Sequence, residues 1–351
     1  MASAVIAWFA RSARELPWRV GSTRRGENRD PYRALVAEAM LQQTQVSRVV
    51  EKFGAFIAEF PTAQDLAAAC EQDVLRAWTG LGYYRRARNL HGAAKMIVNE
   101  FGGRVPRDAE ALRSLPGVGR YTAGAIASIA FDDAAPIVDG NVARVLLRVH
   151  GKDAASDDRR VQPWLWERAG ELVSAAESPA AFNEGLMELG ATVCTPPPAM
   201  PRCGACPLRG VCVAHREGRE GEIPRPKVRA VRTTVYCAAA LIERTDGAVL
   251  MEKRGDSGMW AGMWQTPTLE RTDRPPTGAE VSRAVGVPER ALKRIEVFEF
   301  LATHRRMVFE VFGARVGRDH PRGRGEFVAC RLAGARGLSA PQRRIIGSMC
   351  V

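Results

Sequence analysis

The sequence predicts two successive folds, an all-α domain followed by a smaller α+β domain. Apolar residues repeat at helical spacing through residues 1 to about 213, whereas beyond residue 233 they gather in short strand-like runs. Between these regions, residues 214–233 lose apolar periodicity and carry many charges, which is typical of a linker. We therefore predict a helical domain over 1–213, a linker over 214–233 and an α+β domain over 234–351.

Composition restricts the class of protein further. The 351 residues carry a formal net charge of +12, which favours an anionic partner, nucleic acid first and an acidic membrane surface second. The sequence has no run of about 18 apolar residues, so we expect no membrane span. Residues 1–10 lack a basic start and predict a first helix, not a signal peptide.

Start signals divide the helical region into its elements. Asp30 followed by Pro31 predicts an N-cap and first helical position. The next helix shows a core stripe at helical spacing. The stripe consists of Val49, Phe53, Phe56, Ile57 and Phe60, and further helices are expected to begin near Thr62, Asp108, Arg120, Asn141 and Ala180.

Residues 112–124 (LRSLPGVGRYTAG) predict helix, tight turn and helix. Pro116 ends the first helix, and we expect Gly117 and Gly119 to take backbone angles that side chains disfavour. Such a turn can direct free N–H groups at a phosphate, helped by the positive end of the second helix. Asp139 follows in residues 137–142 (IVDGNV). The alternative is an ordinary helical hairpin, with Asp139 as an N-cap.

An acid is predicted on the buried face of the first long helix. Ala34, Ala37, Glu38 and Leu41 fall at positions i, i+3, i+4 and i+7. Burial raises the pKa of a carboxyl group above about 4.3, so that it can stay protonated and serve as a general acid. The alternative is a glutamate at the helix edge that pairs with a basic neighbour.

Four of the eight cysteines crowd into nineteen residues: Cys194, Cys203, Cys206 and Cys212, separated by eight, two and five residues. This clustering predicts a metal site in a reducing compartment and not a disulfide framework. Zinc and a four-iron cluster both accept four thiolates, and the spacing alone slightly favours zinc. We expect Cys70, Cys237, Cys330 and Cys350 to be ordinary apolar residues.

The α+β region has its own signals. Runs over 235–242 and 248–253 are joined through Asp246 and Gly247, a hairpin signal, and runs over 295–301 and 307–316 form a second pair. Residues 281–285 and 288–293 predict short helical pieces.

Several motifs together resemble one family. The hairpin with its following acid is similar to the helix-hairpin-helix DNA glycosylases of the endonuclease III superfamily. Residues 38–46 (EAMLQQTQV), 78–90 (WTGLGYYRRARNL) and 138–142 (VDGNV) are very close to MutY-type adenine DNA glycosylases. The resemblance covers about residues 14–213 and implies an all-α glycosylase domain that flips a base out of duplex DNA.

The resemblance assigns the chemistry residue by residue. It implies that Glu38 is the general acid, that Asp139 stabilises the positive charge on the sugar, and that Asn141 and Tyr121 order Asp139 and the attacking water. Bifunctional glycosylase/lyases of this superfamily carry a lysine at the position of Tyr121, so this chain is expected to be monofunctional.

The resemblance also assigns the residues that contact DNA. Leu16, Trp18, Glu184 and Met187 match positions that line the adenine pocket, with Glu184 hydrogen-bonded to the purine edge. Gln43 and Tyr83 match the residues that insert into the duplex. Tyr83 and Tyr84 are alternatively core aromatics. Gly117 and Gly119 match contacts to the DNA backbone.

Residues 182–191 (FNEGLMELGA) resemble the helix before the [4Fe–4S] loop of endonuclease III and MutY-type glycosylases. The resemblance therefore implies a [4Fe–4S] cluster on Cys194, Cys203, Cys206 and Cys212. The family's first gap is usually six residues, and here it is eight.

Residues 257–267 (SGMWAGMWQTP) resemble the Nudix-like C-terminal domain of MutY proteins. Residues 278–293 lack the glutamate cluster of Nudix hydrolases, so we expect recognition here and not pyrophosphate hydrolysis. The family's Phe-Ser-His loop, which reads 8-oxoguanine, corresponds to Ala302, Thr303 and His304. The alternative for these three residues is an ordinary hairpin tip.

The resemblance thus implies a cytoplasmic, nucleoid-associated monomer that excises adenine opposite 8-oxoguanine or guanine in double-stranded DNA, without membrane contact. Three alternatives stay open. They are a thymine or uracil mismatch glycosylase, a non-catalytic iron–sulfur DNA-binding or redox-sensing protein, and a zinc-bearing scaffold.

Overall fold

The computed structural model describes residues 1–19, 29–226, 231–302, 304–320, 325–334 and 336–347. Its contacts divide the chain into two compact units, Met1–Ala69 with Arg86–Val228, and Cys70–Arg85 with Arg229–Val351. The domain boundaries given by the sequence stay predictions, and the contacts group Cys70–Arg85 with the second unit.

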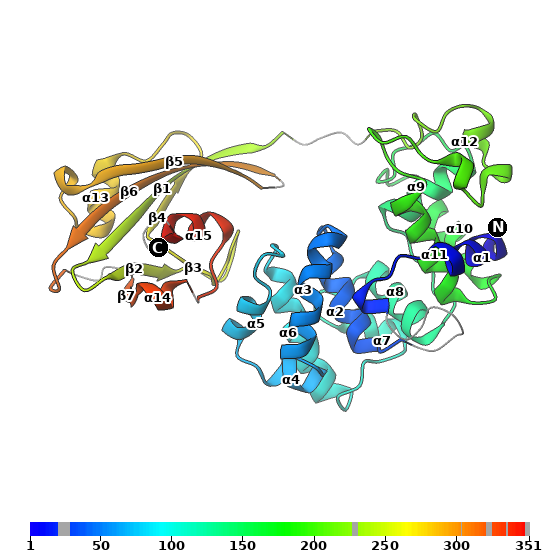
Figure 1. The fold of residues 1–351 in the computed structure, drawn as a ribbon, viewed down its shortest axis with the longest axis horizontal. Helices are drawn as coiled ribbons and strands as arrows, with labels where there is room; N and C mark the ends of the chain where they lie inside the picture. Colours follow the sequence, from blue (N-terminus) through cyan, green and yellow to red (C-terminus); the bar gives the residue numbers. More distant parts are fainter. Residues whose placement is uncertain (20–28, 227–230, 303, 321–324, 335, 348–351) are drawn as a thin grey trace. The chain divides into compact units, whose positions relative to one another are not determined.

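The first unit is helical (Figure 1). Its helices are α1 (Ala2–Ser12), η1 (Pro17–Arg19), α2 (Pro31–Leu41), α3 (Val46–Glu59), α4 (Ala63–Ala68), α6 (Arg85–Glu100), α7 (Ala109–Ser114), α8 (Arg120–Phe131), α9 (Gly140–Val149), α10 (Gln162–Ser174), α11 (Pro179–Thr192) and α12 (Val213–Arg216), with the short turns η2 (Cys203–Ala205) and η3 (Arg209–Val211). Helix α5 (Glu71–Ala77) lies in the segment grouped with the second unit.

Local chemistry explains where helices begin. Asp30 caps α2, since its side chain accepts from the backbone N–H groups of Tyr32 and Arg33, as the sequence predicted. Thr62 and Asp65 form a capping box at α4. Helix α2 differs from the expected amphipathic stripe because it is buried on nearly every side, from Ala34 through Met40. Glu38 is therefore buried because α2 is an interior helix.

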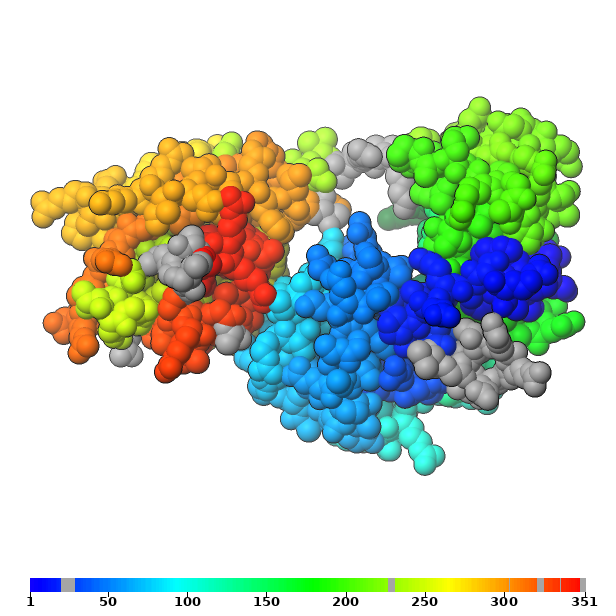
Figure 2. All heavy atoms as spheres, in the orientation of Figure 1, coloured from blue at the N-terminus to red at the C-terminus, as the bar shows by residue number. Residues whose placement is uncertain are grey.

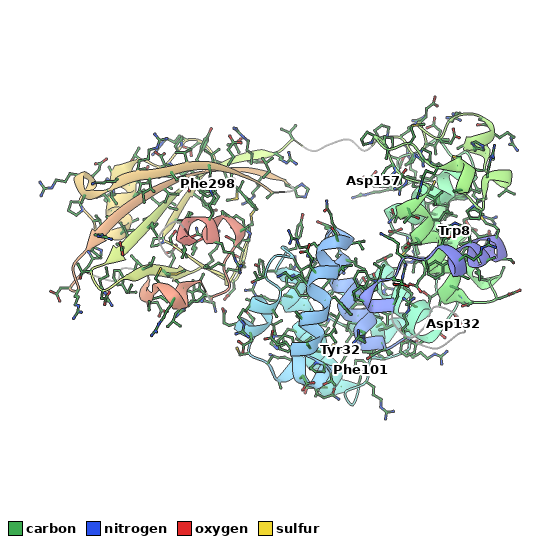
Figure 3. The ribbon with its side chains drawn as sticks, viewed as in Figure 1. Trp8, Tyr32, Phe101, Asp132, Asp157 and Phe298 are labelled. Atoms are coloured by element: carbon green, nitrogen blue, oxygen red, sulfur yellow. The ribbon has the colours of Figure 1, made fainter. Side chains whose placement is uncertain are left out.

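A hydrophobic core of the first unit packs the N-terminal helix against a helix from late in the helical region. Helix α1 packs along α11, and the dark-blue N-terminal residues lie against the green α11 in Figure 2. Trp8, labelled in Figure 3, and Phe9 are buried with Phe182 and Leu186 of α11. Helices α8, α9 and α10 share this core, which fixes α8, α9 and α11 relative to one another.

The predicted hairpin joins α7 and α8. Gly117 has φ +79°, and an added Cβ would lie 2.7 Å from the Asn89 side chain, so glycine is required there. The expectation for Gly119 is wrong, because its φ of −89° and ψ of −178° are extended angles open to any residue. Gly119 is the N-cap of α8, and because it has no side chain, it does not cap the backbone N–H groups at this helix start.

The second unit contains a seven-stranded sheet in the order β3-β2-β1-β6-β5, with β4 paired to β1 and β7 to β2. The strands are β1 (Thr233–Arg244), β2 (Ala248–Lys253), β3 (Trp264–Gln265), β4 (Thr268–Arg271), β5 (Lys293–Leu301), β6 (Arg305–Val316) and β7 (Glu326–Ala329). Strands β1 and β6 run parallel at the centre, and both predicted hairpins are present as antiparallel pairs.

Alternation along β1 builds two cores. Val235, Cys237, Ala239 and Leu241 face one core with Ile345 and Ile346 of α15 (Ala340–Gly347). Ala238, Ala240 and Ile242 face the other, with Val281 and Val285 of α13 (Gly278–Val285). Phe298, labelled in Figure 3, lies under Arg344 of α15, 4.3 Å from ring centroid to guanidinium carbon. The sheet is thus covered on both faces.

The α+β prediction is confirmed, with differences in detail. The piece expected over 288–293 is only the turn η4 (Glu289–Ala291), because β5 begins at Lys293. The short strands β3, β4 and β7 and the helices α14 (Cys330–Ala333) and α15 were not foreseen. Among the described residues, none of the helices has the length and apolarity that crossing a bilayer requires.

Candidate active site

One pocket of the helical unit gathers residues from η1, α2, α8, α9 and α11. Its lining includes both predicted catalytic carboxyl groups and all four residues assigned to the adenine pocket. These lining residues are Leu16, Trp18, Glu38, Tyr121, Asp139, Asn141, Glu184 and Met187. Residues that lie up to 171 positions apart in the sequence, Leu16 and Met187, therefore share one surface.

Glu38 has the environment of a proton donor. Its side chain is 7 % exposed, and burial raises its pKa to about 7. The nearby charges of Asp139 and Glu184 act in the same direction, while a hydrogen bond with Tyr121 and the charge of Arg29 act against it. A substantial protonated fraction of Glu38 therefore persists near neutral pH.

Asp139 is held by the start of α9. Its Oδ1 accepts from the Val142 N–H at 2.7 Å, and its Oδ2 accepts from Asn141 Nδ2 at 2.8 Å. The N-cap alternative is therefore correct as local structure, and it is compatible with catalysis because the pocket still reaches the carboxylate. Burial raises the pKa of Asp139, while these donors and the charge of Arg144 oppose the rise.

Tyr121 is directed at the acid. Its hydroxyl lies 3.3 Å from Met187 Sδ and hydrogen-bonds with Glu38. Burial raises the pKa of Tyr121 well above its usual value, so the phenol is neutral. Asn141 contacts Asp139 as expected, whereas the hydroxyl of Tyr121 is directed at Glu38 and Met187.

Sequence reasoning missed a buried chain of charges along the pocket wall. Glu184 Oε1 accepts from Arg19 Nε at 3.1 Å and from Arg29 Nη1 at 2.6 Å, and its Oε2 accepts from Arg29 Nη2. Glu188 is bound by Arg14 Nε at 2.6 Å and by Arg19 Nη2 at 3.0 Å. The only sequence signal was the position of Arg19 directly after the Leu16–Trp18 segment. Glu184 lines the pocket with its carboxylate held by arginines.

The two residues expected to insert into DNA share a backbone feature. Gln43 has φ +55° and Tyr83 has φ +46°, and non-glycine residues seldom take such left-handed angles. Gln43 is exposed and Tyr83 is 47 % exposed, whereas Tyr84 is buried. The core alternative therefore applies to Tyr84, and the assigned wedge residues are presented outward by strained turns, each within its own unit.

The four clustered cysteines line one cavity beside α9. Arg148, which is 1 % exposed, donates from Nη1 to Cys194 Sγ at 3.2 Å and to the Thr195 carbonyl at 2.9 Å. Its buried Nη2 has no hydrogen-bond partner among the described residues. A buried cation with an unsatisfied N–H at a four-thiol cavity fits an anionic group there.

Two further polar side chains, His215 and Glu220, line the same cavity beside Cys203. Cys203, His215 and Glu220 place ligand atoms within 4.8 Å of one another, with the Glu220 carboxylate 2.5 Å from His215 Nδ1. Of the other cysteines in the described part of the chain, Cys237 is a buried apolar residue as expected. Cys70 is exposed, Cys330 is disulfide-bonded, and Cys350 lies outside the described residues.

In the second unit, His304 is exposed and lines a hollow together with Glu270, Arg271 and Asp273. Ala302 is half-buried, and Thr303 lies outside the described residues. Glu280 of α13 accepts from Thr277 N and pairs with Arg271 and Arg274, which hold its pKa well below its usual value. The carboxylate of Glu280 therefore stabilises the start of α13.

Two domain profiles match the chain. Residues 36–171 match the HhH-GPD superfamily of base excision DNA repair proteins, and residues 238–348 match the NUDIX domain. Among solved structures, a thermostable thymine-DNA glycosylase matches with a TM-score of 0.54 and 30 % identity, covering 62 % of this chain and 95 % of that one. A non-covalent endonuclease III–DNA complex matches with a TM-score of 0.50 and 25 % identity, covering 62 % and 94 %. The fold and the pocket thus define a base excision repair protein of the helix-hairpin-helix class.

Curated relatives identify the family within this class of base excision repair proteins. Adenine DNA glycosylase of Mus musculus is 36 % identical, covering 88 % of this chain and 69 % of the relative. That of Homo sapiens is 35 % identical, covering 90 % and 67 %, and that of Mycolicibacterium smegmatis is 45 % identical, covering 58 % and 66 %. The chain belongs to the MutY-type adenine DNA glycosylase family, as its motifs predicted.

Proposed function

We propose that this chain is a monofunctional glycosylase that excises adenine mispaired with 8-oxoguanine or guanine during base excision repair. The observation that carries the proposal is the presence of Glu38 and Asp139 in one pocket, the first with a pKa raised to about 7. Glycoside hydrolysis requires two carboxyl groups of this kind, one able to give a proton and one able to face positive charge. The names of the curated relatives support adenine as the excised base.

The reaction follows from these positions. Glu38 donates its proton to an imidazole-ring nitrogen of the extruded adenine, and the N-glycosidic bond breaks with its electron pair moving to the base. Positive charge develops on the sugar, and ionised Asp139 stabilises it. Water then adds to the anomeric carbon and releases a proton. Tyr121 carries no amine, so no Schiff base forms with the sugar.

Duplex DNA is the partner that the fold class and the DNA-bound structural relative support. The net charge of +12 favours a polyanion, and the N–H groups at the α7–α8 turn can bind a phosphate. Gln43 and Tyr83 are the side chains proposed to fill the space left by the flipped base. We propose that the protein acts as a monomer at the chromosome.

The second unit is proposed to read the base opposite adenine. Its likeness to the NUDIX domain and the exposure of His304 in the lining of a hollow support this role. The family's aromatic residue is replaced by Ala302, so the 8-oxoguanine preference depends on Thr303 and His304.

The cysteine cavity is proposed to hold a [4Fe–4S] cluster on Cys194, Cys203, Cys206 and Cys212. When bound, such a cluster would serve as a structural centre that fixes the loop between α11 and α12. Its net negative charge would satisfy the Arg148 guanidinium, whose Nη2 has no partner among the described residues. Zinc on four thiolates is the alternative.

A panel of duplexes tests the proposed function. With A:8-oxoguanine and A:G, we expect strand cleavage only after alkali treatment, because base release without lyase chemistry leaves an intact abasic strand. T:G and U:G duplexes should stay uncut. Cleavage of T:G or U:G in preference to adenine substrates would support the pyrimidine alternative, and no base release in single turnover would support a non-catalytic protein. A preference for A:8-oxoguanine over A:G below about threefold would contradict lesion recognition.

The pH dependence of base release should follow Glu38. Its protonated form is the active one, so the single-turnover rate should be high below about pH 7 and fall about tenfold per pH unit above it. The measurement is the rate of adenine release from pH 5.5 to 9 on prebound duplex. A rate that rises through this range would contradict Glu38 as the proton donor.

Metal analysis separates the two centres proposed for the cysteines. We expect about four iron atoms and no stoichiometric zinc per chain, with a brown protein solution, and loss of the iron in Cys206→Ser. The matched control Cys237→Ser lies in the second unit and should keep its iron. A colourless preparation with one zinc per chain would favour the zinc alternative.

A further inference from the structure

Arginine side chains fill most of the hydrogen-bond acceptor sites of the Glu184 carboxylate. A carboxylate offers about four acceptor sites. Three N–H groups occupy them: Arg19 Nε and Arg29 Nη1 on Oε1, and Arg29 Nη2 on Oε2. One site of Oε2 is left, on a side chain that lines the base pocket.

Arg29 supplies most of the hydrogen bonds to the Glu184 carboxylate. It contributes two of the three donors in a fork that matches both carboxylate oxygens. Arg19 contributes one N–H to Glu184 and also binds Glu188 at 3.0 Å. Arg29 and Glu184 are 8 % and 4 % exposed, so each is the main compensation for the buried charge of the other.

We propose that Arg29 is a positioning residue that fixes the orientation of the Glu184 carboxylate, with a single acceptor site open to the extruded base. This inference rests on the proposed function, since it concerns how the same pocket selects adenine. The 6-amino group of adenine donates a hydrogen bond to that site. A 6-oxo purine presents an acceptor there, and two facing acceptors repel.

The prediction for Arg29 differs from that for a merely structural arginine. Without Arg29, Glu184 keeps only the Arg19 N–H on Oε1, and Oε2 has no donor to fix it. The carboxylate can then rotate and turn its oxygens away from a 6-oxo group, which removes the repulsion between the two acceptors. Loss of Arg29 should therefore reduce the discrimination between adenine and hypoxanthine, and not only the rate.

The experiment measures single-turnover release of adenine and of hypoxanthine opposite 8-oxoguanine by the full chain. Arg29→Met should lower adenine release about 10–100-fold and lower the adenine-to-hypoxanthine ratio at least tenfold. Arg29→Lys keeps the charge but not the fork, so its ratio should lie in between. Arg33→Met is the matched control, because Arg33 packs on Phe53 and donates to the Pro17 carbonyl without touching Glu184.

A double-mutant cycle tests whether Arg29 acts through Glu184. Glu184→Gln should lower the ratio by itself, and adding Arg29→Met should lower it no further. If Arg29→Met does not fold, as judged by thermal unfolding, Arg29→Lys and Glu184→Gln decide the question. An unchanged ratio in the folded Arg29 variants would overturn the inference while adenine release by the unmodified chain still supports the proposed function. If the unmodified chain released no adenine, the proposed function itself would fail.

Discussion

Replacing Glu38 by glutamine is expected to abolish adenine release while leaving DNA binding intact. Glutamine keeps the size and burial of the side chain but has no acidic proton to give. The base must then leave as an anion, and we expect the single-turnover rate to fall by at least roughly three orders of magnitude. Affinity for an A:8-oxoguanine duplex should change less than about threefold.

The same substitution has a second expected effect, on stability. The pKa of Glu38 is raised from 4.5 to about 7, so the folded state binds the proton more tightly than the unfolded state does. That advantage is complete below about pH 4.5 and is lost as pH rises through 7. At pH 8, Glu38→Gln should therefore be more stable than the unmodified chain by up to about 3 kcal/mol, a difference that vanishes near pH 4.

Two controls make the result specific. Glu100→Gln changes an exposed glutamate at the end of α6 and should leave both rate and stability unaltered. Urea titrations at pH 4.5 and 8 measure the stability difference. Substantial turnover by Glu38→Gln would remove Glu38 from the role of general acid, and a stability gain without loss of rate would leave its burial as a purely structural feature.

Replacing Asp139 by asparagine should lower the single-turnover rate of adenine release about as much as Glu38→Gln does. The amide cannot stabilise the positive charge that develops on the sugar, so we expect a fall of roughly three orders of magnitude or more. Asparagine caps helices about as well as aspartate, so the bond to Val142 N–H and the start of α9 should survive. Asp139→Ala loses the cap as well and should unfold about 1 kcal/mol more easily than Asp139→Asn.

Asp108 offers the matched control for this change. It caps α7 through Glu110 N and Ala111 N, lies outside the pocket, and is exposed. Asp108→Asn should keep normal single-turnover rates. If Asp139→Asn kept a rate within tenfold of the unmodified chain, the role of Asp139 would be limited to its N-cap.

Local sequence determined much of this protein. Asp30 with Pro31 fixed the start of α2, Gly117 fixed the hairpin turn, and alternation over 235–242 fixed the strand β1, because each depends on neighbours a few residues away. The motifs around Glu38, Asp139 and the cysteines indicated the family and most pocket residues. The short strands β3 and β4 were not predicted, since a strand of two to four residues has too little periodicity to be recognised in the sequence.

Tertiary structure alone decided how the pocket wall is charged. Arg29 and Glu184 lie 155 residues apart, and Arg19 and Glu188 lie 169 apart, so no local pattern links them. It also decided that Tyr121 bonds to Glu38, and that α2 is buried on nearly every side. Hydrogen bonds and burial of this kind depend on which helices pack together, and the core shared by α1, α8, α9 and α11 is what brings these distant side chains into contact.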